Sequence, residues 1–268
     1  MTINHSSSPT QCYQIKQINA FKDNYIWAIV RENRCAIVDP GDSQPVLAFL
    51  QQHSLILTDI LITHHHPDHI GGVKDLLQEF PNAGVFTPNT ERFDHISTFS
   101  CEDNQTVSLN LGIEFQSIYL QGHTLDHIGY YDQYNAFVGD TLFSVGCGRL
   151  FEGTPQQMLS SLKKLMSLPE NTNIYCAHEY TLSNIDFALT VEPNNKLLQR
   201  YQSEVQELRV RNIASIPTTI KTQIEVNPFL RVSSNEIQTN VIKHFKLQEQ
   251  NLTEADYFTY IRKWKDDF

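Results

Sequence analysis

The chain has 268 residues, of which 40% are hydrophobic and 19% are charged, and its formal net charge at pH 7 is -10. This composition is typical of an ordinary globular protein, and no apolar run reaches the length that a membrane-spanning helix needs. The negative charge opposes binding to phosphate backbones, so we expect a small-molecule substrate, with no nucleic acid and no membrane among the partners.

The N-terminal residues and the cysteines favour a cytoplasmic location. Residues 1–10 lack the basic segment and the apolar run of a secretory signal. The five cysteines are an odd number without CxxC spacing, which fits reduced thiols better than a disulfide framework. We expect each to be a small buried residue rather than a ligand or a nucleophile. They are Cys12, Cys35, Cys101, Cys147 and Cys176.

Strands, a turn and one helix are predicted before residue 63. Residues 13–38 alternate apolar and polar side chains in short runs, which predicts two or three antiparallel strands. The segment Asp39-Pro40-Gly41-Asp42 has the composition of a turn, so its two aspartates are interpreted as turn residues rather than ligands. An amphipathic helix is expected over 44–53, and a buried strand over 55–62.

That strand leads into Thr63-His64-His65-His66-Pro67-Asp68-His69, the segment that restricts the chemistry most. Its imidazoles and carboxylate match the ligands of a borderline-soft divalent metal. A solvated polar loop is the alternative, but the run lies between a buried strand and a helical segment that begins after Gly71-Gly72. We therefore predict a metal site at the carboxyl end of a strand, where open sheets usually bind ligands.

The rest of the chain falls into two parts. Before residue 180 we predict a helix over 155–167, with Thr154 as its N-cap, and six further strands. These strands span residues 84–87, 106–109, 113–120, 128–131, 136–139 and 173–176. Many short strands with few helices predict two packed sheets covered by helices. From residue 182 the apolar spacing becomes helical, so we expect a main domain of residues 1–180 and a smaller α-helical domain of residues 181–268.

Two metal ions are more natural than one, because neighbouring residues on one tight turn cannot all face the same ion. Three predicted strand ends offer further ligands: Gly122-His123-Thr124, Gly139-Asp140-Thr141 and Ala177-His178-Glu179. Each alone could be a capped or surface side chain, but the repeated position favours all three as ligands. Asp140 could bridge two cations with its two carboxylate oxygens.

The remaining histidines are given other roles. We expect the side chain of His65 to point away from the metal that its neighbours share. His127 is a candidate for supporting a ligand or facing the substrate. The others are expected to be surface or packing residues, namely His5, His53, His95 and His244.

The motif at 63–69 resembles the T-H-x-H-x-D-H signature of the metallo-β-lactamase superfamily. His123, Asp140 and His178 follow in the order of its binuclear members. Within the superfamily the chain resembles the glyoxalase II, or hydroxyacylglutathione hydrolase, family along essentially its whole length. The resemblance rests on residues 21–25, 139–143, 146–154, 178–181, 227–231 and 262–268. It implies an α/β fold, an αβ/βα four-layer sandwich with a smaller C-terminal α-helical domain.

The resemblance also implies a ligand set for two divalent ions, with zinc expected and iron or manganese possible. The first metal would be held by His64, His66 and His123. The second would be held by Asp68, His69 and His178, with Asp140 as the bridge.

The family's glutathione contacts correspond to Arg149, Tyr180, Arg262 and Lys265. The three cations suit the two carboxylates of a glutathione moiety. For any one of them without the resemblance, a solvated surface charge would be the simpler interpretation.

The activity that the resemblance implies is hydrolysis of S-(2-hydroxyacyl)glutathione thioesters. S-D-lactoylglutathione would give D-lactate and glutathione, the second step of methylglyoxal detoxification, in a monomeric enzyme. Two metal ions can lower the pKa of a shared water from about 15.7 towards neutrality. Asp68 and Asp140 are the expected catalytic residues. The alternatives are another hydrolase of this fold, such as a lactonase, or a metal-binding protein without turnover.

Three positions depart from the family pattern. Phe151 stands where some members have a tyrosine whose hydroxyl reaches the peptide of the substrate. Asp126 replaces a glycine of the Gly-His-Thr-x-Gly-His form, and Ala177 replaces another common glycine. None of the three is an expected metal ligand.

Overall fold

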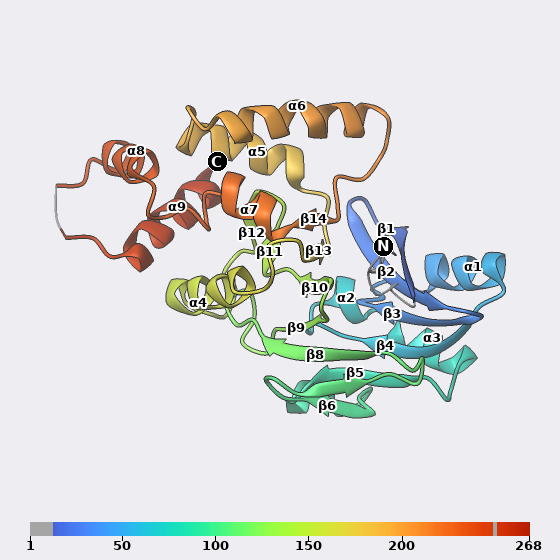
Figure 1. Cartoon of the computed structure of the whole chain (residues 1–268). Coiled ribbons are helices and arrows are strands. Elements are labelled where there is room, and N and C mark those ends of the chain that lie inside the picture. The colour runs from blue at the N-terminus through green and yellow to red at the C-terminus, as the bar shows by residue number, and fades with distance from the viewer. Residues whose placement is uncertain (1–12, 249–250) are drawn as a thin grey trace, which may run out of the picture.

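The computed structural model describes residues 13–248 and 251–268, and two six-stranded sheets form its centre (Figure 1). In the first sheet the strands follow chain order, and β3 to β6 are parallel to one another. They are β1 (Gln14–Ala20), β2 (Asn24–Arg31), β3 (Arg34–Val38), β4 (Ile56–Leu61), β5 (Gly84–Pro88) and β6 (Phe99–Cys101).

The second sheet collects strands from the later part of the chain, and its neighbours β10 and β13 are parallel. In order across the sheet its strands are β14 (Thr218–Thr219), β13 (Asn173–Cys176), β10 (Asn135–Gly139), β9 (Ile128–Tyr131), β8 (Glu114–Tyr119) and β7 (Thr106–Ser108). A separate hairpin joins β11 (Leu142–Phe143) to β12 (Gly146–Cys147).

Helices cover the outer faces of this pair of sheets (Figure 1). The helices of the described residues are α1 (Ser43–His53), α2 (Pro67–Ile70), α3 (Val73–Glu79), α4 (Pro155–Met166), α5 (Thr181–Val191), α6 (Lys196–Val210), α7 (Ile220–Val226), α8 (Asn235–Phe245), α9 (Glu254–Asp267) and the 3-10 helix η1 (Glu91–Phe93). Of these, α6 packs on α5 and α7, and α8 packs on α5 and α9, farther from the sheets.

Apolar side chains on both faces of the first sheet explain the layers. On one face Trp27 and Leu61 share a core with Phe137 of the second sheet. On the other face the strands pack against Val46 of α1 and Leu76 of α3. Because a sheet buried on both faces needs a covering layer on each, helices, sheet, sheet and helices stack in that order. The predicted αβ/βα sandwich is confirmed.

Most predicted elements are present. The segment 13–38 forms three antiparallel strands, and the strand predicted over 55–62 is β4, parallel to β3 and β5. The helix predicted from Pro155 is α4, and Thr154 and Gln157 form a capping box at its start. The structure adds elements that the sequence did not predict, because strands of two or three residues and helices of one or two turns are too short to show periodicity. These are β6, β11, β12, β14, α2, α7 and η1.

Among the described residues after Tyr180, the regular elements are helices apart from β14, which pairs with β13 of the second sheet. Phe187, Phe229, Phe258 and Trp264 pack there within the main core. The later residues therefore extend the second sheet and also cover it. The domain boundary near residue 180 stays a prediction.

Two further expectations concern single residues and membrane spans. The four described cysteines are buried and free, as predicted, whereas Cys12 and His5 lie outside the described residues. Among the described residues, no helix has both the length and the apolar character needed to span a membrane.

Candidate metal centre

The predicted ligands come from strand ends that meet at one edge of the two sheets. β4 of the first sheet runs directly into residues 63–69. In the second sheet β8, β10 and β13 run in the same direction, and His123, Asp140 and His178 follow them. The backbone N–H of Ile128 donates to the carbonyl oxygen of Thr63 at 2.9 Å, which joins the two sheets beside the motif.

The motif itself contains the short helix α2, where the sequence predicted a polar turn. Pro67 stands in its first turn, where the missing N–H costs nothing, and the N–H of His69 donates to the carbonyl oxygen of His66 at 2.9 Å. Gly41 lets the preceding turn approach this helix closely, because a Cβ there would lie 1.8 Å from the carbonyl oxygen of Asp68. This close contact between the two backbones fixes the position of the backbone that carries Asp68 and His69.

The first ligand group consists of His64, His66 and His123. The Nδ1 atom of His66 lies 3.1 Å from Nε2 of His64 and 3.0 Å from Nε2 of His123. Burial, with the neighbouring imidazoles, holds the pKa of each of these histidines below its usual value, most strongly for His64. Neutral imidazoles with free lone pairs are the form that binds a metal.

The second group consists of Asp68, His69 and His178. The Oδ2 atom of Asp68 lies 3.6 Å from Nε2 of His69 and 3.5 Å from Nε2 of His178. Burial lowers the pKa of His69, but the carboxylates of Asp140 and Asp39 outweigh it and raise that pKa to about 9. Three carboxylates, those of Asp39, Asp68 and Asp140, therefore surround His69, whereas the first group contains only imidazoles.

Asp140 lies between the two groups. Its Oδ2 atom is 3.5 Å from Nε2 of His123 and 3.4 Å from Nε2 of His178, and its Oδ1 atom is 3.5 Å from Nε2 of His69. Burial would raise the pKa of Asp140, but His69 and His178 outweigh it and hold that pKa far below its usual value. An ionised carboxylate in contact with both groups has the position that a bridging ligand requires.

The residues present fit divalent cations. Among the described residues, His69 Nε2 and Asp140 Oδ1 are buried atoms without a hydrogen-bond partner. Buried polar atoms are almost always paired, and these two orphans, 3.5 Å apart, are placed where a shared cation would satisfy both. His64, His69 and Asp140 form one compact set of possible ligands, beside the two groups described above.

Carboxylates and carbonyls outside the predicted ligand set hold the far sides of the ligands. Asp39 accepts from the N–H of Thr63 at 2.8 Å and contacts Nδ1 of His69 at 3.0 Å. Asp23 lies 3.2 Å from Nδ1 of His178. Such partners fix the tautomer and orientation of a ligating histidine.

From the sequence we interpreted Asp39 only as a turn residue, and its contact with His69 was not predicted. Asp39 does take a positive φ of 52°, but its carboxylate points into the core rather than into solvent. Its position directly after β3 is the same strand-end position that pointed to the predicted ligands, and this signal was available. Asp42 behaves as predicted, because it caps α1 by accepting from the N–H of Gln44.

His127 and His65, for which the sequence suggested supporting roles or none, occupy different environments. His127 is buried, its ring stacks on His64 at 4.7 Å, and its Nε2 accepts the backbone N–H of Asp140 at 3.1 Å. It therefore supports Asp140 from behind. His65 points away from both ligand groups, as predicted, and its Nδ1 lies 2.8 Å from Oδ2 of Asp126.

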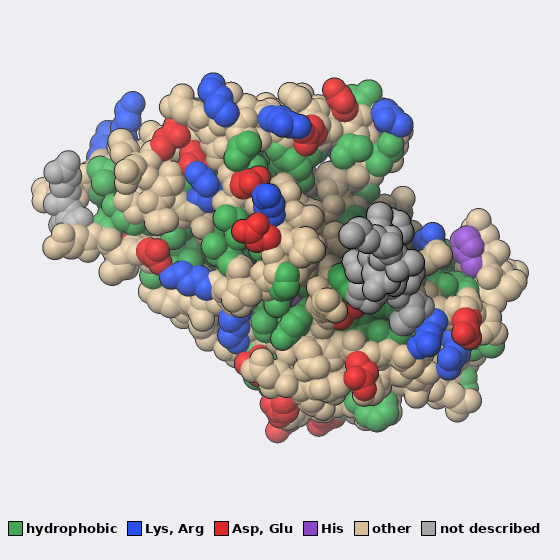
Figure 2. All heavy atoms as spheres, in the orientation of Figure 1, with side chains coloured by type: hydrophobic (Ala, Val, Ile, Leu, Met, Phe, Trp, Pro, Cys, Tyr) green, Lys and Arg blue, Asp and Glu red, His purple; other side chains and the backbone are tan. Residues whose placement is uncertain are grey.

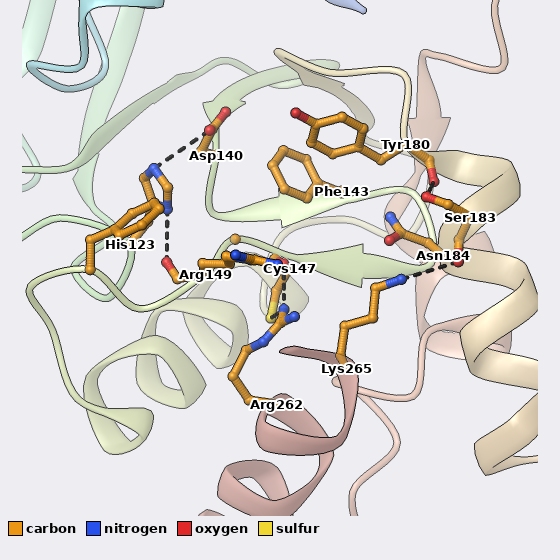
Figure 3. A pocket seen from close by; sticks show the side chains of 12 residues that line it. His123, Asp140, Phe143, Cys147, Arg149, Tyr180, Ser183, Asn184, Arg262 and Lys265 are labelled. Carbon is orange, nitrogen blue, oxygen red and sulfur yellow. Dashed lines mark hydrogen bonds and ion pairs between the residues drawn. The ribbon is translucent and has the colours of Figure 1, made fainter. Parts of the chain in front are cut away.

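A cavity of about 350 Å³ opens beside the centre, and His123 and Asp140 form part of its wall (Figure 3). All four predicted substrate contacts line it, namely Arg149, Tyr180, Arg262 and Lys265. Phe151, which the family comparison of the sequence already pointed to, also lines it, whereas the sequence did not predict Phe143, Ser183 and Asn184. A ligand in this cavity can touch the metal-ligand residues and the cations at the same time.

The cations of the cavity differ in their exposure and in the number of their contacts within the protein. The side chain of Arg149 is 64% exposed, and its Nε lies 3.5 Å from Asp266. Arg262 is buried, donates from Nη1 to the carbonyl oxygen of Cys147 at 2.9 Å and from Nη2 to Asp266 at 3.0 Å, and lies over the ring of Phe229. Its role is thus partly structural, which the sequence did not indicate.

Lys265 and Tyr180 line the same side of the cavity. The Nζ of Lys265 donates to the carbonyl oxygen of Ser183 at 3.1 Å, and burial, with the charge of Arg262, lowers its pKa to about 8. The ring of Tyr180 stacks on His178 at 4.7 Å. Burial, with nearby Asp23, raises the pKa of Tyr180, so its hydroxyl keeps its proton and remains a donor.

Phe151 forms the wall next to the first ligand group. Its ring meets His123 at 5.2 Å and His66 at 5.5 Å in edge-to-face contacts, although Phe151 is 64% exposed. An exposed aromatic ring at this place gives the cavity an apolar rim.

One face of the molecule carries mixed charges. On the face shown in Figure 2, acidic and basic side chains are interspersed among polar and apolar ones. This agrees with a small-molecule substrate bound in a local cationic cavity.

Comparisons with known proteins agree with the family that the motif and its surroundings indicate. The family model described as "Metallo-beta-lactamase superfamily" matches residues 21–178, and the model described as "Hydroxyacylglutathione hydrolase C-terminus" matches residues 179–268. Hydroxyacylglutathione hydrolase 2 of Vibrio vulnificus is 50% identical over 95% of this chain and 99% of its own length. Hydroxyacylglutathione hydrolase of Aliivibrio fischeri is 47% identical over the same shares.

Solved structures share the fold at lower identity. ETHE1 from Myxococcus xanthus superposes with a TM-score of 0.63 at 22% identity, over 93% of this chain and 99% of that one. The BLEG-1 B3 metallo-β-lactamase superposes with a TM-score of 0.62 at 22% identity, over 81% and 99%. The near-complete matches to the curated relatives and to both family models show that this chain belongs to the hydroxyacylglutathione hydrolase family of the metallo-β-lactamase superfamily.

Proposed function

We propose that this chain hydrolyses S-(2-hydroxyacyl)glutathione thioesters, with S-D-lactoylglutathione giving D-lactate and glutathione in the second step of methylglyoxal detoxification. Relatives at about 50% identity over nearly the whole chain carry the name hydroxyacylglutathione hydrolase. The observation that carries the proposal is the cavity in which Asp140 and His123 share a wall with Arg149 and Lys265. A thioester at the ligand end could then place its glutathione carboxylates on the cations.

Two divalent ions per chain are the proposed cofactors. His64, His66 and His123 would hold one, Asp68, His69 and His178 the other, and Asp140 would bridge them, as the compact ligand groups and the orphaned atoms suggest. When bound, the ions would supply an activated water and stabilise negative charge on the thioester carbonyl. Imidazole and carboxylate ligands suit zinc, which we propose, and also iron or manganese. Elemental analysis of purified protein decides among them.

Asp68 is proposed to orient the attacking water or accept its proton. Its side chain is 41% exposed at the open side of the centre, and Asn24 donates to its Oδ2 at 3.0 Å. Asp140 is proposed to hold the two ligand groups at a fixed separation, with His127 fixing its backbone. Both carboxylates would therefore act on the reacting region directly.

No side-chain nucleophile is needed in this proposal. Cys147 lines the cavity, but burial raises the pKa of its thiol to about 11, so it stays protonated at neutral pH. The leaving group is the thiolate of glutathione, which departs without strong acid assistance. The remaining task of the chain is to bind and align the thioester, which falls to Arg149, Tyr180, Arg262 and Lys265.

We further propose a monomeric, cytoplasmic enzyme with a catalytic domain over 1–180 and an α-helical substrate-binding domain over 181–268. None of the four described cysteines is paired with another, and this supports that compartment. The cavity supports the division of labour, because α9 contributes Arg262 and Lys265 while residues before 180 contribute every proposed metal ligand.

Two other functions are tested against this one. A lactonase or related hydrolase of the same fold would not depend on the cations, so Lys265→Gln should raise KM for a glutathione thioester and leave lactone hydrolysis unchanged. Deleting residues 262–268 would also remove Arg262 and Lys265, but it would disturb the fold as well, because Trp264 packs against Phe187 in the core. A metal-binding protein without turnover would show no chelator-sensitive loss of thioester absorbance.

A further inference from the structure

A charged cluster lies beside the first ligand group and takes no part in the proposed chemistry. It consists of His65, Arg92, Asp126 and Glu152. The four residues come from the motif, from η1, from the turn after β8 and from the segment before α4. Four separate parts of the chain therefore meet here.

The guanidinium of Arg92 occupies the middle of this cluster. Its Nη1 lies 2.7 Å from Oε1 of Glu152 and 3.7 Å from Oδ2 of Asp126. The same nitrogen lies 2.9 Å and 3.0 Å from the two ring nitrogens of His65. His65, Asp126 and Glu152 are close enough to hold a metal, but the cation in their midst is Arg92.

Both carboxylates also hold backbone or side chains of the turn that carries His123. Glu152 accepts from the N–H of Leu125 at 2.9 Å, and Asp126 accepts from the hydroxyl of Thr124 at 2.6 Å. The N–H of Phe151 donates to the carbonyl oxygen of His123 at 3.1 Å. The cluster thus fastens residues 149–153 to the turn 122–127 and, through Arg92, to η1.

The fastened segment forms one wall of the cavity. Phe151, next to Glu152, packs on His66 and His123, and the carbonyl oxygen of Arg149 lies 2.8 Å from Nδ1 of His123. Both Phe151 and Arg149 line the cavity. A shift of this segment would therefore move the wall without removing any proposed metal ligand.

We propose that Arg92, Asp126 and Glu152 are positioning residues that hold segment 149–153 against the edge of the centre formed by His66 and His123. In this way they fix the wall that receives the thioester. Asp126, which departs from the family's glycine, is the buried member of the set and places a second carboxylate on Arg92. The inference rests on the proposed function for its effect on substrate, but not for its effect on the segment.

The expected effect falls on binding. None of the three residues belongs to the proposed metal ligands, so kcat and metal content should change little when the cluster is broken. A wall that is held in place only part of the time lowers the apparent affinity by the lost fraction. Since Arg92 and Glu152 are partly exposed, we expect KM for S-D-lactoylglutathione to rise about three- to tenfold.

The kinetic test compares the metal-loaded wild type with R92Q, R92K, E152Q, D126N and the double variant R92Q/E152Q. R92Q and E152Q should raise KM to a similar extent, the double variant should be no worse than the worse single variant, and R92K should stay near the wild type. K163Q is the matched control, because it removes an exposed ion pair between Lys163 of α4 and Glu254 of α9, and it should leave KM unchanged. Unchanged KM in both R92Q and E152Q, or additive effects, would overturn the inference.

A second measurement does not depend on turnover. Hydrogen exchange of the peptide covering residues 149–153 should be faster in R92Q/E152Q than in the wild type or K163Q, since the amides of Phe151 and Gly153 bond to the turn 122–127. Unchanged exchange would refute the positioning role even if the wild type proves inactive on thioesters, an outcome that refutes the proposed function instead. A third equivalent of metal in the wild type that is lost in E152Q would also overturn the inference, because the cluster would then be a metal site.

Discussion

The Nδ1 atom of His69 lies 3.0 Å from Oδ2 of Asp39, so a buried carboxylate outside the predicted ligand set fixes the direction in which His69 presents Nε2. The same Oδ2 accepts from the hydroxyl of Thr63 at 2.7 Å. Asp39 thus connects the strand end before the first helix to the metal-ligand motif. The arrangement links a residue of the turn after β3 to the proposed metal centre.

Replacing Asp39 by Asn should weaken metal binding by roughly 10- to 100-fold, because His69 loses its charged partner and the tautomer is no longer fixed. Competition against a chromophoric chelator measures the affinity. D42N in the same turn is the matched control, since an asparagine also caps a helix, and it should bind metal as the wild type does. Wild-type affinity in D39N would mean that Asp39 only shapes the turn.

Replacing Asp140 by Ala should abolish thioester hydrolysis and tight metal binding together, because one carboxylate contacts His69, His123 and His178. Metal content by elemental analysis and initial rates on S-D-lactoylglutathione report the two effects. Full activity with stoichiometric metal in D140A would refute the bridging role.

The pH profile should reveal Lys265. Burial lowers its pKa to about 8, so the ammonium is charged below pH 8 and neutral above it. Because the charged form binds a glutathione carboxylate, kcat/KM should fall as the pH rises through 8, by about tenfold in all. K265R keeps its charge over this range and should remove the step. The same step in K265R would assign it to another group.

Arg262 and Lys265 should respond differently to loss of charge. Arg262 is 5% exposed, and its contacts to Cys147, Asp266 and Phe229 are internal, so R262Q should lower stability by about 1.5–3 kcal/mol as well as raise KM. Thermal unfolding should show a melting temperature lower by roughly 5 °C. K265Q should raise KM with a much smaller shift. Equal melting temperatures for the two variants would contradict the structural role of Arg262.

The sequence picked out the proposed metal-ligand residues because their chemistry leaves a local mark. A dense run of imidazoles after a buried strand is rare, and the strand ends before His123, Asp140 and His178 are short apolar runs that can be recognised without a structure. Two packed sheets with helices outside followed from the alternation of short strands and helices, whereas the αβ/βα order of the layers was implied by the family resemblance. These features depend on neighbours within about ten residues.

What the sequence did not predict depends on contacts between distant residues. Asp39 reads as a turn residue until His69, thirty positions later, is placed beside it. Arg262 reads as a surface cation until the carbonyl of Cys147 is found 115 positions away. The two-residue strand β14 has no pattern of its own and exists only because β13 offers it an edge. Each requires the tertiary fold before its role can be recognised.

The most direct test of the proposed activity follows the thioester absorbance of S-D-lactoylglutathione with purified, metal-analysed protein, before and after a chelator and again after metal is restored. We expect rapid loss of absorbance with about two divalent ions per chain, no loss after chelation, and recovery when metal is returned. Protein that carries its metal and leaves the thioester intact, or hydrolysis that continues unchanged in the chelated protein, would contradict a metal-dependent thioester hydrolase.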